Sequence, residues 1–283
     1  MSRGRKKWSE EVIAQLQNEG HGKGRGPTYL PWVRVMDFYS DGRTREFHSH
    51  KFGREHHVLS DGEWSTYLML EWARDVVDVR EQFPLPRDIT LEVAHGLGIA
   101  HQYYPGTHVP FVMTLDFLVN RVNDGSERLQ AFSVKTATEL EDAREIELLE
   151  LARETCHGMD IEHHLVISER LPKTKIQNLS WIRSAQLDED ATEPFPGYFE
   201  EHMSRMAQDI AARRFDGSLA DYCTGYDRRY STEEPGDGLR VARMLMTTRA
   251  LQFDLSNPAP EFAHMDTFRL TARPGRLRSI GGN

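Results

Sequence analysis

The sequence predicts an α/β domain, built on a mixed sheet flanked by helices, followed by a mainly α-helical domain. Two observations predict this order. Over the first 170 residues or so, short segments rich in branched residues alternate with amphipathic helical segments. A polar, proline-containing connection at 168–178, SERLPKTKIQN, then precedes a run of helical patterns. We therefore expect two domains, 1–170 and 171–283.

Composition fits a soluble globular protein. The 283 residues are 39% hydrophobic and 28% charged, and roughly two domains of ordinary size would use this length. No apolar run approaches the length of a membrane span, so we expect no membrane partner. The two cysteines, Cys156 and Cys223, have no paired spacing, which favours a reducing cytoplasm over a disulfide framework or a zinc knuckle.

Charge is distributed unevenly along the chain. The net charge is −9, but residues 1–27 hold six Lys or Arg against three acids, and residues 269–283 hold four Arg and no acid. An acidic body with basic ends fits contact with DNA at some surfaces and with protein partners at others. The alternative is a solvated surface with basic termini.

The N-terminal region begins with a short amphipathic helix over 8–19, with Ser9 as N-cap and Gly20 at its end. The loop that follows, GHGKGRGP, is not a P-loop, and phosphate contact and a plain linker both remain open. Strands and turns are expected over 28–58. The four histidines of HSHKFGREHHVL lack the spacing of a zinc site, which favours phosphate contact or local packing.

A second, strongly apolar helix is expected to begin near Ser60 or Asp61, either of which can cap it. Glu63 falls in its first turn, where the helix dipole favours a carboxylate. On local grounds Glu63 can therefore be a simple capping acid. The segment 76–85 alternates as a strand and ends at the prolines 84 and 86.

Two further strands, 113–120 and 129–135, are joined by a polar turn at 123–126. Asp116 lies inside the first strand and Lys135 ends the second. On paired antiparallel strands these two side chains can meet at one end of the sheet. That arrangement suits a hydrolytic metal site, although a partly exposed ion pair on a hairpin would look the same.

A helix over 139–157 and a strand over 161–168 complete the first domain. Ile146, Leu149, Ala152 and Cys156 form the expected apolar stripe of the helix. Its outer face is acidic and is interpreted as solvated, Glu147 and Glu150 included.

The second domain is expected to hold helices near 179–186, 198–214, 218–230 and 237–248, then a hairpin of 250–255 and 262–272. Helices followed by a two-stranded ribbon are the outline of a winged-helix unit. Arg240 and Arg243 lie on the helix that such domains present to DNA. Winged helices also dock proteins, so both roles remain open.

Several stretches resemble the TnsA family, the endonuclease subunit of heteromeric, Tn-seven-like bacterial transposons, including the CRISPR-associated kind. They are YLPWVRV, FHSHKFGREHHVLSDGEW, LEWARDVVDVREQFPL, MTLDFLV and SVKTA. The resemblance implies a restriction-endonuclease-like catalytic domain over 1–170 and a winged-helix domain over 171–283. It also implies that the chain cuts the strand at the 5′ ends of the transposon.

The resemblance implies a catalytic site formed by Glu63, Asp116 and Lys135. Glu63, Asp116 and the main-chain carbonyl of Val134 would hold Mg²⁺, for which Mn²⁺ would substitute; few carboxylates leave room for water and phosphate. The usual motif of such nucleases places an acid two residues before the lysine, and this family often has a glutamine there. Ser133 occupies that position in this chain and departs from the usual motif. A side-chain ligand at that position is therefore not expected.

The expected partners are transposon-end DNA, the DDE transposase subunit TnsB, and the AAA+ regulator TnsC through the C-terminal domain. The expected DNA-binding side chains in the matching stretches are Lys51, Arg54, His56, His57, Arg80 and Gln82. Two other functions remain open: a stand-alone restriction or repair nuclease, and a non-catalytic DNA-bridging or assembly factor.

Overall fold

The computed structural model describes residues 8–35, 43–186, 193–212 and 214–271. The chain divides into two compact units, Met1–Leu171 and Pro172–Asn283. Each is described separately.

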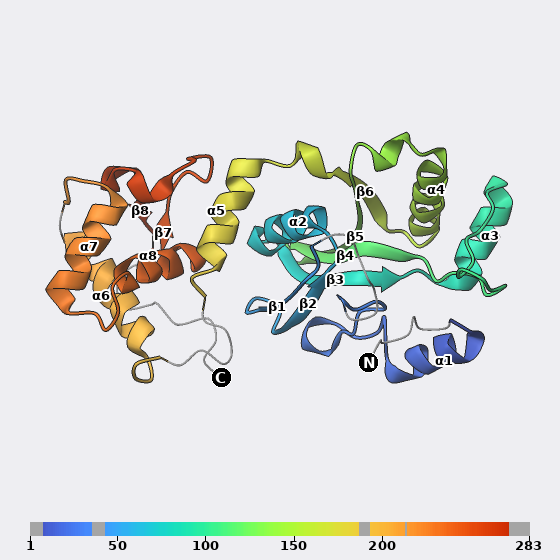
Figure 1. The fold of residues 1–283 in the computed structure, drawn as a ribbon, viewed down its shortest axis with the longest axis horizontal. Coiled ribbons are helices and arrows are strands. Elements are labelled where there is room, and N and C mark those ends of the chain that lie inside the picture. The colour runs from blue at the N-terminus through green and yellow to red at the C-terminus, as the bar shows by residue number, and fades with distance from the viewer. Residues whose placement is uncertain (1–7, 36–42, 187–192, 213, 272–283) are drawn as a thin grey trace. The chain divides into compact units, whose positions relative to one another are not determined.

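The first unit is built on a four-stranded sheet in the order β3-β4-β5-β6 (Figure 1). Its strands are β3 (Val76–Pro84), β4 (Thr114–Asn123), β5 (Ser126–Lys135) and β6 (Glu162–Ile167). β4 is antiparallel to both β3 and β5, whereas β6 is parallel to β5. The sheet is therefore mixed, and the expected α/β class is confirmed.

The hairpin between β4 and β5 has the predicted turn. Asn123 pairs with Ser126, which leaves Asp124 and Gly125 as a two-residue loop. Both have left-handed backbones, with φ of 50° and 80°. Asp-Gly is favoured in such turns because the loop twist matches that of the strands.

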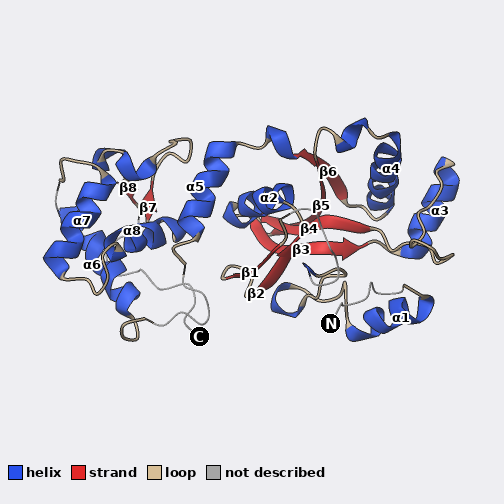
Figure 2. Cartoon of the chain, viewed as in Figure 1, coloured by secondary structure: helices blue, strands red, loops and turns tan. Residues whose placement is uncertain are grey.

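Helices cover both faces of the sheet (Figure 2). On one face α2 (Asp61–Trp72) shares a core with the strands through Tyr67, Val79 and Phe117. On the other, α3 (Arg87–Leu97) and α4 (Ala143–Gly158) share a core with Leu118 and its neighbours. Successive strand residues thus point to opposite layers, as the period of two requires.

The stripe expected on the helix after Lys135 is wrong in part. Glu139–Glu141 forms a separate 3-10 turn, and α4 begins at Ala143 with Asp142 as its N-cap. The buried residues of α4 are Leu148, Leu151, Ala152, Thr155 and Cys156, and Ile146 is 51% exposed. The buried face is therefore a second apolar row, at i, i+3, i+4 and i+7, which lies beside the predicted one. The helix has two apolar rows, and its packing on the sheet decides which of them is buried.

The N-terminal segment packs along the sheet edge. α1 (Glu10–Glu19) has Ser9 as N-cap and ends at Gly20, as predicted. The glycine loop then follows β3: a Cβ on Gly22 would lie 2.2 Å from Pro84 Cγ, and the Trp32 N–H donates to the Gln82 carbonyl at 3.2 Å. A short hairpin of β1 (Arg45–Ser49) and β2 (Arg54–Val58) precedes α2.

The second unit is mainly α-helical, as expected. It holds α5 (Lys173–Arg183), α6 (Tyr198–Ala212), α7 (Leu219–Tyr230) and α8 (Asp237–Thr247). The helix predicted at 179–186 begins earlier, at Lys173, with Pro172 at its N-cap. The predicted connection at 168–178 is therefore mostly helix.

The ribbon of the second unit is much shorter than expected. β7 (Leu251–Gln252) and β8 (Arg269–Leu270) pair at two positions only. The chain between them forms the 3-10 turns Pro260–Phe262 and Met265–Thr267. No helix in the described part of the chain is long and apolar enough to cross a membrane.

Candidate active site

The sheet opens in its middle at the end that carries Asp116. β4 and β5 pair from the turn as far as Phe117 and Phe132, and no further. β4 nevertheless stays paired with β3 to Thr114, and β5 stays paired with β6 to Lys135. The two central strands therefore separate while each keeps its outer neighbour.

Asp116 fills the opening. Its Oδ2 accepts a hydrogen bond from the Val134 N–H at 2.6 Å, replacing the ladder bond that the strands no longer make. The N–H and C=O of one strand residue point to the same edge. The Val134 carbonyl accordingly faces the side on which Asp116 lies, which fits its predicted role.

Glu63 reaches the same region from the first turn of α2. Ser60 is the N-cap and its Oγ accepts from the Glu63 N–H at 3.0 Å. The Glu63 carboxylate is 7% exposed and accepts from the Leu59 N–H at 2.9 Å and from Ser60 Oγ at 3.2 Å. Gln82 Nε2 donates to it at 3.3 Å. Ser60 is thus the cap, as predicted, and these bonds also hold the Glu63 carboxylate beside the sheet.

A close contact fixes the start of α2 against β5. A Cβ on Gly62 would lie 3.1 Å from Val134 Cγ1 and 3.1 Å from the Ser168 Cβ. A side chain at position 62 would require Val134 or Ser168 to give by a few tenths of an ångström. The residue before Glu63 therefore touches the residue whose N–H binds Asp116.

The two carboxyl groups disfavour each other's ionisation. Burial, and then the charge of Asp116, raise the pKa of Glu63, against the hydrogen bonds from Leu59, Ser60 and Gln82. Burial also raises the pKa of Asp116, against the Val134 N–H and the charge of Lys135. Two neighbouring acids that repel each other, one buried and one half-buried, are stabilised by a cation between them. The donor set of two carboxylates and a carbonyl fits Mg²⁺ or Mn²⁺.

Lys135 is held by acids that the sequence did not single out. Its Nζ lies 2.6 Å from Glu145 Oε2 and 3.6 Å from Glu139 Oε1. Burial lowers the pKa of Lys135, but the bond and charge of Glu145 outweigh it and the pKa is raised. Glu147 instead pairs with Arg144, and Glu150 with Arg153. No sequence signal distinguishes Glu145, because the other acids of the helix look equivalent.

No group of three or more His, Cys, Asp or Glu side chains is arranged to hold a metal ion in the ranges that the structure describes. The two carboxylates of Glu63 and Asp116 are thus the side-chain donors available at the opening. Ser133, where an acid is usual, donates to or accepts from His163 Nε2 at 2.9 Å instead.

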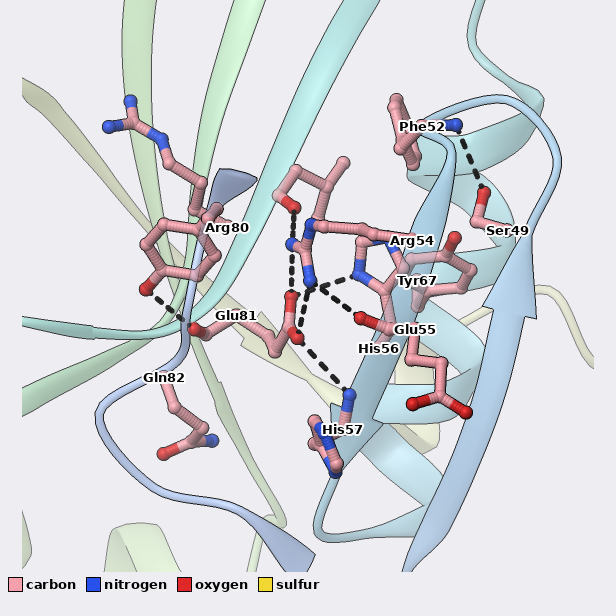
Figure 3. Close-up of polar contacts among 12 residues, drawn as sticks. Ser49, Phe52, Arg54, Glu55, His56, His57, Tyr67, Arg80, Glu81 and Gln82 are labelled. Atoms are coloured by element: carbon pink, nitrogen blue, oxygen red, sulfur yellow. Dashed lines mark hydrogen bonds and ion pairs between the residues drawn. The ribbon is translucent and has the colours of Figure 1, made fainter. Parts of the chain in front are cut away.

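Five of the six predicted DNA-binding residues are buried, and three of them lie around Glu81 (Figure 3). Arg54 places two nitrogens on the fully buried Glu81 carboxylate, at 2.8 and 2.6 Å. His56 Nδ1 lies 2.9 Å from the same carboxylate, and the His57 N–H donates to it at 3.2 Å. The Arg54 and His56 side chains are therefore partners of a buried carboxylate, which does not support their predicted contacts with DNA. His57 gives Glu81 only its main-chain N–H, and its side chain is itself buried.

The other predicted contacts differ in their surroundings. Arg80 is 8% exposed and donates to Asn120 Oδ1 at 2.8 Å, so a contact with DNA does not fit it either. Lys51 is exposed, and its Nζ binds the Glu71 and Ala73 carbonyls at the end of α2. Gln82 belongs to the candidate site through Glu63.

The two arginines of the second unit serve helix packing. Arg243 Nε donates to the Trp181 carbonyl at 2.8 Å, and its guanidinium lies over the Trp181 ring. Arg240 Nε donates to the Ala185 carbonyl at 3.3 Å, and its guanidinium lies over Phe199. Both side chains therefore bind neighbours of α8, and their contact with DNA stays a prediction.

Comparison with known proteins connects this geometry with a family. The family model described as TnsA-like endonuclease N terminal matches residues 73–168, and the one described as TnsA endonuclease C terminal matches residues 171–255. The transposon Tn7 transposition protein TnsA of Escherichia coli is 34% identical over 255 residues, covering 90% of each chain. The chain belongs to the TnsA endonuclease family.

Proposed function

We propose that this protein is the DNA endonuclease subunit of a transposase and that it hydrolyses the phosphodiester at the 5′ ends of the transposon with Mg²⁺. The observation that carries the proposal is the opening between β4 and β5, where Asp116 binds the Val134 N–H and Glu63 approaches from α2. Such an opening exposes one carboxylate and one carbonyl to a common point, which a plain sheet does not.

Glu63, Asp116 and the Val134 carbonyl would hold the metal. Bound Mg²⁺ supplies a Lewis acid for the phosphate and lowers the pKa of a coordinated water. Lys135, kept protonated by Glu145, would offset the negative charge that develops on the phosphate oxygens. The protein's own contribution is to keep two acids close together before the metal binds.

The proposed partners follow from membership of the family. In the cytoplasm, the chain would act on transposon-end DNA together with the DDE transposase TnsB, which cuts and joins the 3′ ends. The second unit would dock the AAA+ regulator TnsC. The separate family match over 171–255 supports a distinct role for this unit.

The test uses labelled transposon ends with the complete set of subunits and Mg²⁺. Asp116→Ala should lower 5′ nicking by more than about 100-fold, because even outer partners of metal ligands contribute 10- to 100-fold. Joining of the 3′ ends by the transposase should continue. Asp88→Ala, which removes an exposed aspartate at the start of α3, is the matched control and should nick normally.

Two results would contradict the proposal. Normal nicking by Asp116→Ala would show that the active site lies elsewhere. Absence of nicking by the wild-type protein in the full assembly would favour a non-catalytic assembly factor.

A further inference from the structure

Gln82 has an unusual backbone inside β3, near the end of the strand. Its neighbours Glu81 and Phe83 pair with Phe117 and Leu115 of β4, so Gln82 stands opposite Asp116 in the register. Its φ is +48°, a left-handed conformation that costs free energy for any residue with a side chain. Strained backbone of this kind persists only where the surroundings impose it, and it is common at functional sites.

The Gln82 amide spans the two elements that carry the acids. Nε2 donates to Glu63 Oε2 at 3.3 Å, and Oε1 accepts from Thr114 Oγ1 of β4 at 3.3 Å. The side chain is 4% exposed, so these bonds are not shared with bulk water. An extended strand would direct the side chain differently, and the left-handed turn is what brings the amide to Glu63.

Buried polar contacts hold the backbone on both sides of Gln82. The Glu81 carboxylate binds Arg54, His56 and the His57 N–H, and the Glu81 carbonyl accepts from Tyr29 Oη at 2.9 Å. The Gln82 carbonyl accepts from the Trp32 N–H. Figure 3 shows the Gln82 amide pointing away from this cluster. The cluster therefore fixes the main chain and leaves the amide for Glu63.

We propose that Gln82 is a positioning residue for Glu63, whose carboxylate it holds in the orientation that receives the divalent metal. This inference rests on the proposed function. Three donors then fix the Glu63 carboxylate: the Leu59 N–H, Ser60 Oγ and Gln82 Nε2. Ligand carboxylates bind metals more tightly when partners of this kind hold them in place.

The Gln82→Gly variant tests the contribution of the side chain separately from that of the strained backbone. Glycine adopts a φ near +48° freely, so the strand keeps its path while the amide is removed. The half-saturating Mg²⁺ concentration for 5′ nicking by the complete assembly should rise on the order of tenfold. Binding of Mn²⁺ to the full chain, measured by electron paramagnetic resonance without DNA, should weaken by a similar factor. The midpoint of thermal unfolding should not fall.

Asp124→Gly is the matched control, because Asp124 has a φ of 50° in the exposed turn between β4 and β5. It should leave the Mg²⁺ and Mn²⁺ dependence unchanged. Gln82→Asn is the second variant: asparagine tolerates the left-handed backbone, but its amide is one methylene too short to span Glu63 and Thr114. It should shift both metal dependences in the same direction as Gln82→Gly.

Wild-type metal dependence in both Gln82 variants would overturn the inference. So would weaker nicking with unchanged Mn²⁺ binding, since positioning of a ligand must alter binding. If the wild-type assembly does not nick at all, the proposed function fails, and the Mn²⁺ measurement still tests Gln82.

Discussion

Glu63 combines a place at the start of a helix with the proposed role of a metal ligand. Its place in the first turn of α2 is that of a capping acid, and it does accept from the Leu59 N–H. Its burial and the nearby charge of Asp116 raise its pKa, which no cap alone would do. Local sequence therefore predicts the cap, whereas only the packing of α2 on β5 makes the acid part of a site.

Metal affinity should depend on pH through these two acids. Their pKa values are raised to about 8 for Glu63 and about 6 for Asp116, and a metal binds the ionised forms. Apparent Mn²⁺ affinity should therefore increase from pH 6 to pH 8 and level off above. A titration of the full chain at several pH values measures this. An affinity that does not change over that range would show that the two acids are already ionised.

The same acids should make the metal-free protein less stable as pH rises. When folding raises the pKa of a carboxyl group, the protonated group stabilises the folded protein fully at pH values below the pKa of the unfolded chain. This stabilisation is lost as the pH rises toward the pKa of the folded protein. In the Glu63→Gln variant the side chain at position 63 cannot ionise, so its share of this pH-dependent loss of stability is removed. In EDTA it should raise the midpoint of thermal unfolding relative to wild type more at pH 8 than at pH 5. An equal effect at both values would refute the raised pKa of Glu63.

Loss of one partner of the buried Arg54–Glu81 pair should strongly destabilise the first unit. Removal of one partner of a buried pair leaves an uncompensated charge and costs about 3–5 kcal/mol. Arg54→Met should lower the free energy of unfolding of the first unit by that amount, measured by urea titration. Arg25→Met is the control, because Arg25 pairs with Glu127 on the surface and such pairs contribute about 0–1 kcal/mol. Similar losses in both variants would contradict the assignment.

At the scale of elements, the position of α2 on β5 should control activity. Gly62→Ala forces Val134 or Ser168 to move by a few tenths of an ångström, which displaces Glu63. We expect 5′ nicking to fall by about tenfold, since misplacement by 1 Å can cost about 100-fold. The midpoint of thermal unfolding should change little, because alanine is the better helix former.

Gly96→Ala provides the control for that experiment. Gly96 lies in α3, and a Cβ there would meet no atom within 4 Å. This change should stabilise the protein by about 0.5–1 kcal/mol and leave nicking unaltered. Normal nicking by Gly62→Ala would mean that α2 does not set the site.

The hairpin of β4 and β5 was predictable because its signals are local. Alternating apolar residues and the Asp124–Gly125 turn specify it without the rest of the chain. The opening beyond Phe117 was not predictable, because it depends on the outer strands keeping their own pairs. The cluster around Glu81 was not predicted for the same reason. In the sequence alone Arg54 and His56 look like exposed cations, and only the packing of β2 against β3 brings them to Glu81.

At the scale of the whole molecule, each unit should keep its fold without the other. The described core clusters of the first unit end at Ile161, and in the second unit α8 packs against α5, α6 and α7. A chain that ends at Leu171 should therefore unfold at a midpoint within a few degrees of that of the first unit in the full protein. Differential scanning calorimetry of the full chain and of both fragments measures this.

Regulator binding should remain with the second unit. If TnsC docks there, a fragment of 172–283 should bind purified TnsC with an affinity close to that of the full chain, and the fragment that ends at Leu171 should bind none. Folding of each fragment, verified by its own unfolding transition, separates loss of a binding surface from loss of structure. Binding by the first fragment would transfer the docking surface to the catalytic unit. Regulation would then act directly at the domain that carries Glu63 and Asp116.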